Sequence, residues 1–228
     1  MSVLNNGSIS RTEKLVLIYV FLLLAFGVAM SWFNLSWFNE VYVIEDGFIE
    51  SLTVLALLVV AFLTGKYVVR LSSKRHWMFT AAMTFLCLFS IFAAGEEISW
   101  GQRIFNVESS DFFQKNNAQG ETNLHNLVVG GVKVNKLLFS QLFTVGAAVY
   151  LLILPYFYRK KAGFKGWIDK SGIPVPRWYQ SIAVVVVSLF TVICNGRSSE
   201  LQEFGACTVF FLIILNPLNR EVFAETGK

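Results

Sequence analysis

Residues 15–32 read LVLIYVFLLLAFGVAMSW, a run of eighteen positions without a charged side chain. The hydrocarbon core of a bilayer is about 30 Å thick, and roughly 20 apolar helical residues cross it. A signal peptide has an apolar region of only about 7–15 residues followed by a small-residue cleavage site. This stretch is longer and has no clean A-x-A pattern before a polar start. We therefore interpret it as an uncleaved membrane span.

Five further apolar blocks follow it, at about residues 49–69, 77–94, 137–156, 179–194 and 201–215. Hydrophobic residues make up 55% of the 228 positions, charged residues 15%, and the mean hydropathy is +0.57. A soluble domain usually carries about 25% charged residues. The sequence therefore predicts an all-α, polytopic membrane protein. We expect one transmembrane domain over residues 1–228, a bundle of six helices in a lipid bilayer.

The basic residues predict how this bundle is oriented. Fourteen of the nineteen Lys and Arg residues fall before the first span, after the last, or in the second and fourth loops between spans. The positive-inside rule places this set of loops in the cytoplasm. All six tryptophans fall at predicted span ends, as in an aromatic belt. We expect a multi-pass protein of the cell inner membrane with both termini cytoplasmic.

The acidic residues have the opposite distribution. Eleven of the fifteen fall on the predicted non-cytoplasmic side, gathered mainly at residues 45–51, 95–103, 116–127 and 195–203. Acidic residues contribute little to orientation, so this bias needs another cause. The polar segment 95–135 between the third and fourth spans is predicted to be a re-entrant or interfacial segment, or a lid over a shared site.

Some of these carboxylates have an ordinary explanation. Asp46 and Glu200 stand near predicted helix starts, where the helix dipole favours negative charge. Glu50 and Glu203 lie a turn deeper, beside apolar residues, where a carboxylate is costly unless it is paired or faces a wet cavity. Their depth favours a functional role.

Glu96 and Glu97 are adjacent at the end of the third span, where the helix dipole disfavours negative charge. The structural interpretation is an internal ion pair of Glu96 with Arg103, which shares its helix face two turns further on, together with an interfacial Trp100. The functional interpretation is a ligand or proton site.

The third cluster contains His125, the single histidine of the polar side, because His76 falls in a cytoplasmic loop. Thr122 is a plausible N-cap for a short helix reaching Val129. Glu121, four residues before His125, would approach it around the first turn. A hydrogen-bonded structural histidine and a ligand histidine both remain open.

Three hypotheses follow, and the first is an intramembrane hydrolase or transferase acting on lipid at the non-cytoplasmic face. Its catalytic acid, base or ligand groups would be Glu96, Glu97, Glu121 and His125. An anionic lipid headgroup would be bound by Ser99, Trp100, Gln102, Arg103 and Arg197. One divalent metal ion, the expected cofactor, would be held by Glu50, Glu97, His125 and Glu203.

The second hypothesis is a structural subunit that binds a membrane-protein partner and whose polar clusters satisfy one another. The third is a proton- or cation-coupled transporter in which Glu50 and Glu203 titrate. No predicted span carries a charge near its centre, which disfavours transport. The sequence contains no nucleotide-binding loop, G-x-S-x-G elbow or H-E-x-x-H motif, and a nucleic-acid partner is not expected.

Residues 45–50 and 95–127 resemble a family of uncharacterised bacterial polytopic membrane proteins. That family pairs E-D-G-x-x-E with G-E-E-x-S-W-G-Q-R and N-x-Q-G-E-x-N-L-H-N-L, and the resemblance implies a polytopic fold and no activity. Elsewhere the chain is similar in hydropathy alone. Ceramidase-type and progestin-receptor-type membrane hydrolases bind zinc through three histidines, which a single chain with one histidine on that face cannot supply. The paired E-x-x-H motifs of di-iron bundles are also absent.

Overall fold

The structure, a computed structural model, describes residues 9–124, 126–129, 132–133 and 143–225. The described chain is all-α apart from one short antiparallel pair, β1 (Val128–Val129) and β2 (Val132–Lys133). In this pair Val128 lies opposite Lys133 and Val129 lies opposite Val132.

Among the described residues, three helices are long and apolar enough to cross a membrane. They are α1 (Arg11–Phe33), α3 (Phe48–Leu71), which a short 3-10 turn extends to Lys74, and α4 (Trp77–Glu97). They contain the first three predicted spans, so the prediction is confirmed there. The chain is thus a candidate multi-pass membrane protein.

The other three predicted spans correspond to shorter helices. The region of the fourth is described from Phe143 onward as one helical path, and α10 and α11 follow it as a hairpin: α7 (Phe143–Ala148), η5 (Val149–Ile153), α8 (Leu154–Lys160), α10 (Trp178–Val192) and α11 (Ser199–Leu215). Their lengths alone do not show six spans.

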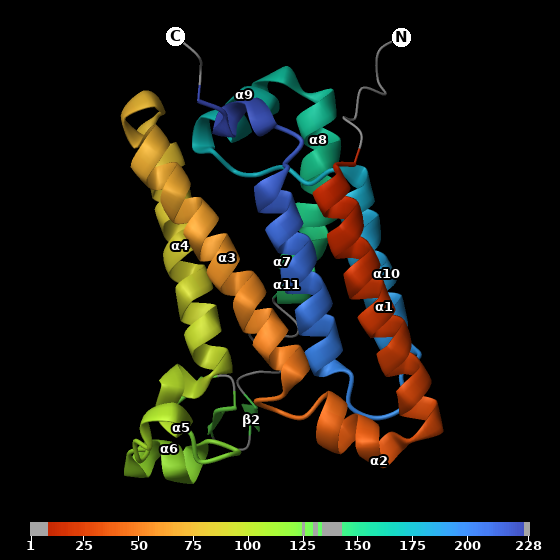
Figure 1. Cartoon of the computed structure of the whole chain (residues 1–228). Helices are drawn as coiled ribbons and strands as arrows, with labels where there is room; N and C mark the ends of the chain where they lie inside the picture. The colour runs from red at the N-terminus through yellow and green to blue at the C-terminus, as the bar shows by residue number, and fades with distance from the viewer. Residues whose placement is uncertain (1–8, 125, 130–131, 134–142, 226–228) are drawn as a thin grey trace.

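The remaining helical elements are short and lie at the ends of the long helices (Figure 1). At one end lie α2 (Leu35–Trp37), η1 (Phe38–Tyr42), η3 (Ser99–Gly101), α5 (Gln102–Phe105) and α6 (Asp111–Asn116). At the opposite end lie η2 (Ser72–Lys74), α9 (Ala162–Ser171) and η6 (Arg220–Phe223).

We call these the acidic end, where α3 and α11 begin and α4 ends, and the basic end, where α1 begins and α3 and α11 end (Figure 1). A buried carboxylate ties helices together at the basic end. Glu13 of α1 has no exposed surface and accepts hydrogen bonds from Tyr179 of α10 and from Asn216 after α11, at 2.8 Å from Asn216 Nδ2. Ser10 and Glu13 also form a capping box at the start of α1.

The largest core cluster lies where α1, α3, α10 and α11 meet, and includes Leu24, Ile49, Val187 and Leu201. Large apolar side chains also stand exposed along the outer faces of the long helices, such as Leu22, Phe62, Phe85 and Val192. An apolar surface of this extent is typical of a protein surrounded by lipid.

The close approach of α10 and α11 depends on Gly205. A Cβ atom at this position would lie 2.5 Å from Cγ1 of Val187. We expect Gly205→Ala to lower the free energy of unfolding by about 1–3 kcal/mol, as overpacking does, measured by denaturant titration in detergent.

Gly146 of α7 provides the control, because a Cβ there meets no atom within 4 Å. Gly146→Ala should leave stability unchanged or raise it by up to about 1 kcal/mol, since alanine favours helix. Equal effects of the two substitutions would contradict the packing explanation.

Candidate functional site

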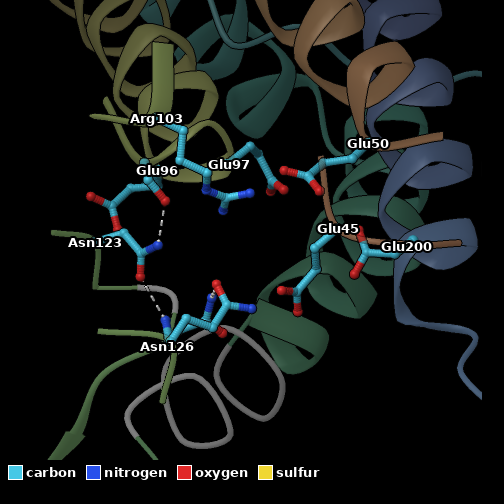
Figure 2. A pocket seen from close by; sticks show the side chains of 10 residues that line it. Glu45, Glu50, Glu96, Glu97, Arg103, Asn123, Asn126 and Glu200 are labelled. Carbon is cyan, nitrogen blue, oxygen red and sulfur yellow. Dashed lines mark hydrogen bonds between the residues drawn. The ribbon is translucent and has the colours of Figure 1, made fainter. Parts of the chain in front are cut away.

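A polar pocket opens at the acidic end, between the end of α4, the starts of α3 and α11, and the segment 99–127 (Figure 2). Its cavity volume is about 20 Å³, which is room for a single water molecule or ion, and it is partly open to solvent. Its lining is mainly carboxylates and amides: Glu45, Glu50, Glu96, Glu97, Ser99, Arg103, Gln119, Asn123, Asn126 and Glu200. Residues from all four polar clusters of the sequence, at 45–51, 95–103, 116–127 and 195–203, thus line one pocket.

The pocket is shaped by a tight turn that ends α4. Ser99, Trp100 and Gly101 all have left-handed backbone conformations, with φ of 47°, 55° and 73°. Such a conformation costs roughly 1–3 kcal/mol in a residue other than glycine, so neighbouring contacts must maintain it. One of these is the hydrogen bond from Trp100 Nε1 to Glu96 Oε1, 2.8 Å long. The helix therefore does not continue to Arg103.

Glu96 is buried and anchors the segment that follows the turn. Its Oε2 accepts a hydrogen bond from the backbone N–H of Leu124 at 2.5 Å, while its Oε1 accepts the one from Trp100. Both carboxylate oxygens of Glu96, a predicted catalytic residue, thus accept hydrogen bonds that fix the turn after α4 and the backbone at Leu124.

Arg103 of α5 lines the pocket and is paired with two carboxylates. It forms ion pairs with Asp46, at the start of α3, and with Glu121, whose Oε1 lies 2.6 Å from Nε of Arg103. Ser99 Oγ donates a second hydrogen bond to Glu121 at 2.6 Å. Burial alone would raise the pKa of Glu121, but the hydrogen bonds from Arg103 and Ser99 and the charge of Arg103 lower it below its usual value near 4.5.

The helix predicted from Thr122 to Val129 is wrong. Residues 121–124 form bends and isolated turns, and β1 occupies Val128–Val129. Asn117 Oδ1 accepts hydrogen bonds from the backbone of Gln119 and Glu121, and Asn123 Oδ1 accepts one from Asn126. Asparagine side chains that bond the local backbone in this way compete with helix formation.

Gln102 and Asn123 connect this segment to the turn after α4. Gln102 bonds Ser109 through Nε2 and the backbone N–H of Thr122 through Oε1, at 2.7 and 2.8 Å. Asn123 Nδ2 donates to Ser99 Oγ at 2.8 Å. The segment 99–127 is therefore a folded cover, fixed to the end of α4 by side-chain hydrogen bonds.

Three other carboxylates of the acidic end lie close together, and one of them, Glu200, accepts a hydrogen bond from Ser199 Oγ at 3.4 Å. One oxygen each of Glu97, Glu200 and Glu203 lie within 4.8 Å of one another. Oε2 of Glu203 is buried, and the described part of the chain offers it no hydrogen-bond partner. None of the three forms an ion pair with any described residue.

Glu50 completes this group from α3. Its carboxylate lies beside that of Glu97 (Figure 2) and accepts a 2.5 Å hydrogen bond from the backbone N–H of Asp46. Asp46 is itself left-handed, with φ of 58°, and Gly47 is the N-cap residue of α3. Asp46 therefore precedes the N-cap of α3, and its backbone N–H donates to the carboxylate of Glu50 in the first turn.

The spacing of the three carboxylates suits one divalent cation. Metal–oxygen distances of about 2.0–2.6 Å separate two ligand oxygens on opposite sides of an ion by about 4–5 Å. Adjacent carboxylates that lack a positive partner repel unless they take up protons or a cation. The group can therefore hold a cation or protons.

Other predicted site residues lie away from this group. Trp100 is half-exposed beside Glu96, and Arg197 is exposed in the loop before α11, where its backbone N–H bonds Asn39. His125, predicted as a catalytic and metal-binding residue, lies outside the described residues.

Sequence reasoning did not select several pocket residues, namely Glu45, Gln119, Asn123, Asn126 and Glu200. The signal for Glu200 was its position three residues before Glu203, which puts both side chains on one face of α11. The amides carried no such signal.

Comparison with known proteins adds no relative: no family model, curated protein or solved structure matches the chain.

The lowered pKa of Glu121 predicts a pH-dependent contribution to stability. The ionised carboxylate stabilises the fold above its usual pKa near 4.5, and this stabilisation is lost as pH falls through the lower folded pKa. Glu121→Gln should therefore be less stable than the unmodified protein at pH 7, and the gap should narrow on acidification below about pH 4.5.

Denaturant titrations at pH 7, 5 and 3.5 would measure this difference in the free energy of unfolding. The exposed Glu108 provides the control, because Glu108→Gln removes an acid at the same end. A gap for Glu121→Gln that stays constant with pH would contradict the prediction.

Proposed function

We propose that the chain crosses the membrane six times, with both termini in the cytoplasm and the acidic end on the other side. The path 143–160, α10 and α11 alternate in direction with α1, α3 and α4 (Figure 1). Fourteen of the nineteen basic residues then fall on the cytoplasmic side, as the positive-inside rule requires. The inner membrane of a bacterium fits this arrangement and the motif resemblance.

Cysteine labelling tests this topology. In sealed right-side-out vesicles, a membrane-impermeant maleimide should label Glu108→Cys directly and Ser73→Cys only after permeabilisation. Both positions are exposed, at opposite ends of the structure. The native Cys87, Cys194 and Cys207 are replaced by alanine in both variants. The reverse pattern, or equal labelling of both, would refute the orientation.

We further propose that the carboxylate pocket binds one divalent cation as the centre of a hydrolase or transferase acting on lipid. The observation that carries this is the group Glu97, Glu200 and Glu203, one oxygen of each lying within 4.8 Å of the others, with no ion pair to any described residue. The buried, unpartnered Oε2 of Glu203 points to a missing ligand as well.

The location of the pocket supports lipid as the substrate. Glu50, Glu97 and Glu200 lie at the ends of α3, α4 and α11. If these helices span a bilayer, their ends lie at the depth of the lipid headgroups. A divalent cation held by Glu97, Glu200 and Glu203 would activate a water and polarise an ester or phosphoryl oxygen. Glu50, beside Glu97, would serve as the base that accepts a proton.

A structural subunit is the second candidate, and one observation favours it. Asp46, Arg103 and Glu121 satisfy one another, and Glu96 holds the segment 99–127 through two hydrogen bonds. These residues would stabilise a docking surface equally well. Whether the protein is an enzyme or a structural subunit is therefore decided by what Glu97, Glu200 and Glu203 bind.

The experiment measures cation binding and turnover on the same protein. After removal of metal by chelation, Mn²⁺ binding is followed by electron paramagnetic resonance, with Zn²⁺, Mg²⁺ and Ca²⁺ as competitors. Products released from phospholipid and sphingolipid mixtures are followed by mass spectrometry. We expect Glu97→Gln and Glu203→Gln to weaken Mn²⁺ binding by at least about 10–100-fold, the range seen when even outer ligands are lost.

Glu40→Gln and Glu108→Gln are the matched controls, because both remove an exposed carboxylate at the acidic end. They should bind Mn²⁺ as the unmodified protein does. No binding of any of the four cations would refute the cation site. Binding without lipid turnover would refute the enzyme and favour the structural subunit, whereas cation flux in proteoliposomes would indicate transport.

A further inference from the structure

A second feature lies at the basic end, where a lysine sits inside a candidate membrane span. Lys66 is five residues before Leu71, the last residue of α3, so its Cα lies about 8 Å from the helix end. Its side chain is exposed, and no ion pair joins it to any described residue. A lysine at this depth is costly unless its ammonium reaches the interface or an anion.

Lys66 lines a cleft of about 240 Å³ between the end of α3 and the C-terminal segment. Arg70 is one helical turn further along the same face of α3, so the two positive charges converge on the cleft. The full lining is Lys66, Tyr67, Arg70, Leu71, Phe223 and Glu225. Two cations and one acid thus surround an otherwise apolar space.

The base of the cleft is rigid and apolar. The rings of Tyr67 and Phe223 have centroids 5.2 Å apart, and Leu71 and Phe223 are buried. Arg75 holds the C-terminal segment in place by donating to the backbone oxygens of Val222 and Ala224, at 2.9 and 2.8 Å. Arg75 is therefore occupied, and Lys66 and Arg70 supply the positive charge.

The apolar part of the cleft can contact an acyl chain. Tyr67, Leu71 and Phe223 line it beside the two cations, and Tyr67 OH is itself held 3.4 Å from the backbone oxygen of Ile214. A lipid whose acyl chain lies against these side chains places its headgroup level with Lys66 and Arg70.

Glu225 is the single acid of the cleft lining, and it does not close the site. Its Oε1 lies 3.4 Å from Nη1 of Arg70, and both side chains are more than half exposed. An exposed pair of this kind contributes little to stability, so a phosphate can take the place of Glu225. Arg70 could then bind two phosphate oxygens at once.

We propose that this cleft binds the phosphate of an anionic phospholipid of the leaflet at the basic end. Lys66 and Arg70 hold the phosphate, and the rings of Tyr67 and Phe223 contact the glycerol and the upper acyl chains. The site is separate from the carboxylate pocket, lies at the other end of the molecule, and does not depend on the proposed catalytic function.

The test compares lipids that differ in charge alone. Full-length protein in neutral detergent is titrated with phosphatidylglycerol or phosphatidylcholine, and bound lipid is counted by native mass spectrometry. The unmodified protein should retain phosphatidylglycerol preferentially. Lys66→Gln/Arg70→Gln should weaken its binding by about 30-fold, roughly 5-fold per charge, as expected for cations at an anionic surface.

Lys74→Gln/Lys170→Gln is the matched control, because it removes two exposed positive charges of the same end that do not line the cleft. It should bind phosphatidylglycerol as the unmodified protein does. Lys66→Arg/Arg70→Lys, which keeps both charges, should retain binding within a few-fold, and equal melting temperatures without anionic lipid verify folding.

Equal loss in the control and cleft variants would refute the site and indicate a diffuse effect of surface charge. Equal retention of the two lipids would refute it as well. Glycerol phosphate distinguishes the source of the phosphate: displacement of the lipid at millimolar concentration would show a site for free phosphate and overturn the lipid proposal.

Discussion

A carboxylate that leaves water at the end of an apolar helix has to be compensated by hydrogen bonds, a positive charge, a proton or a metal ion. Glu96 meets this requirement through Trp100 and Leu124, and in doing so fixes the segment that covers the pocket. Glu121 meets it through Ser99 and Arg103. The fold of residues 99–127 follows from these two solutions. Glu97 has no ion pair with a described residue, and it therefore forms the centre of the candidate site.

Burial of a carboxylate does not by itself indicate function in this protein. Glu13 at the basic end is more fully buried than Glu203 at the acidic end, yet Tyr179, Asn216 and Ser10 together satisfy both of its oxygens. It therefore serves as a structural link between helices. Glu203 has a buried oxygen without a described partner. The distinction between structure and site lies in the partners of each group, which the sequence does not reveal.

The sequence predicted the long helices well, because apolar runs report directly on lipid burial. Predicted spans at 15–32, 49–69 and 77–94 fall inside α1, α3 and α4. The sequence indicated which acidic residues lie at the same end of the protein, but not which residues form ion pairs with them. Arg103 was paired with Glu96 by helical spacing, whereas its ion-pair partners Asp46 and Glu121 come from other segments. No residue type at Ser99 or Trp100 indicates that both adopt positive φ.

That turn explains why two adjacent glutamates have different roles. Successive helix residues point about 100° apart, so Glu96 faces the segment 99–127 while Glu97 faces α3 and α11. Had α4 continued, Arg103 would have lain two turns after Glu96 on the same face of the helix, away from Glu97. The left-handed turn instead directs Arg103 to Asp46 and Glu121. In either arrangement Arg103 does not pair with Glu97, and Glu97 and Glu203 form no ion pair with a described residue, which is the state a cation-binding site requires.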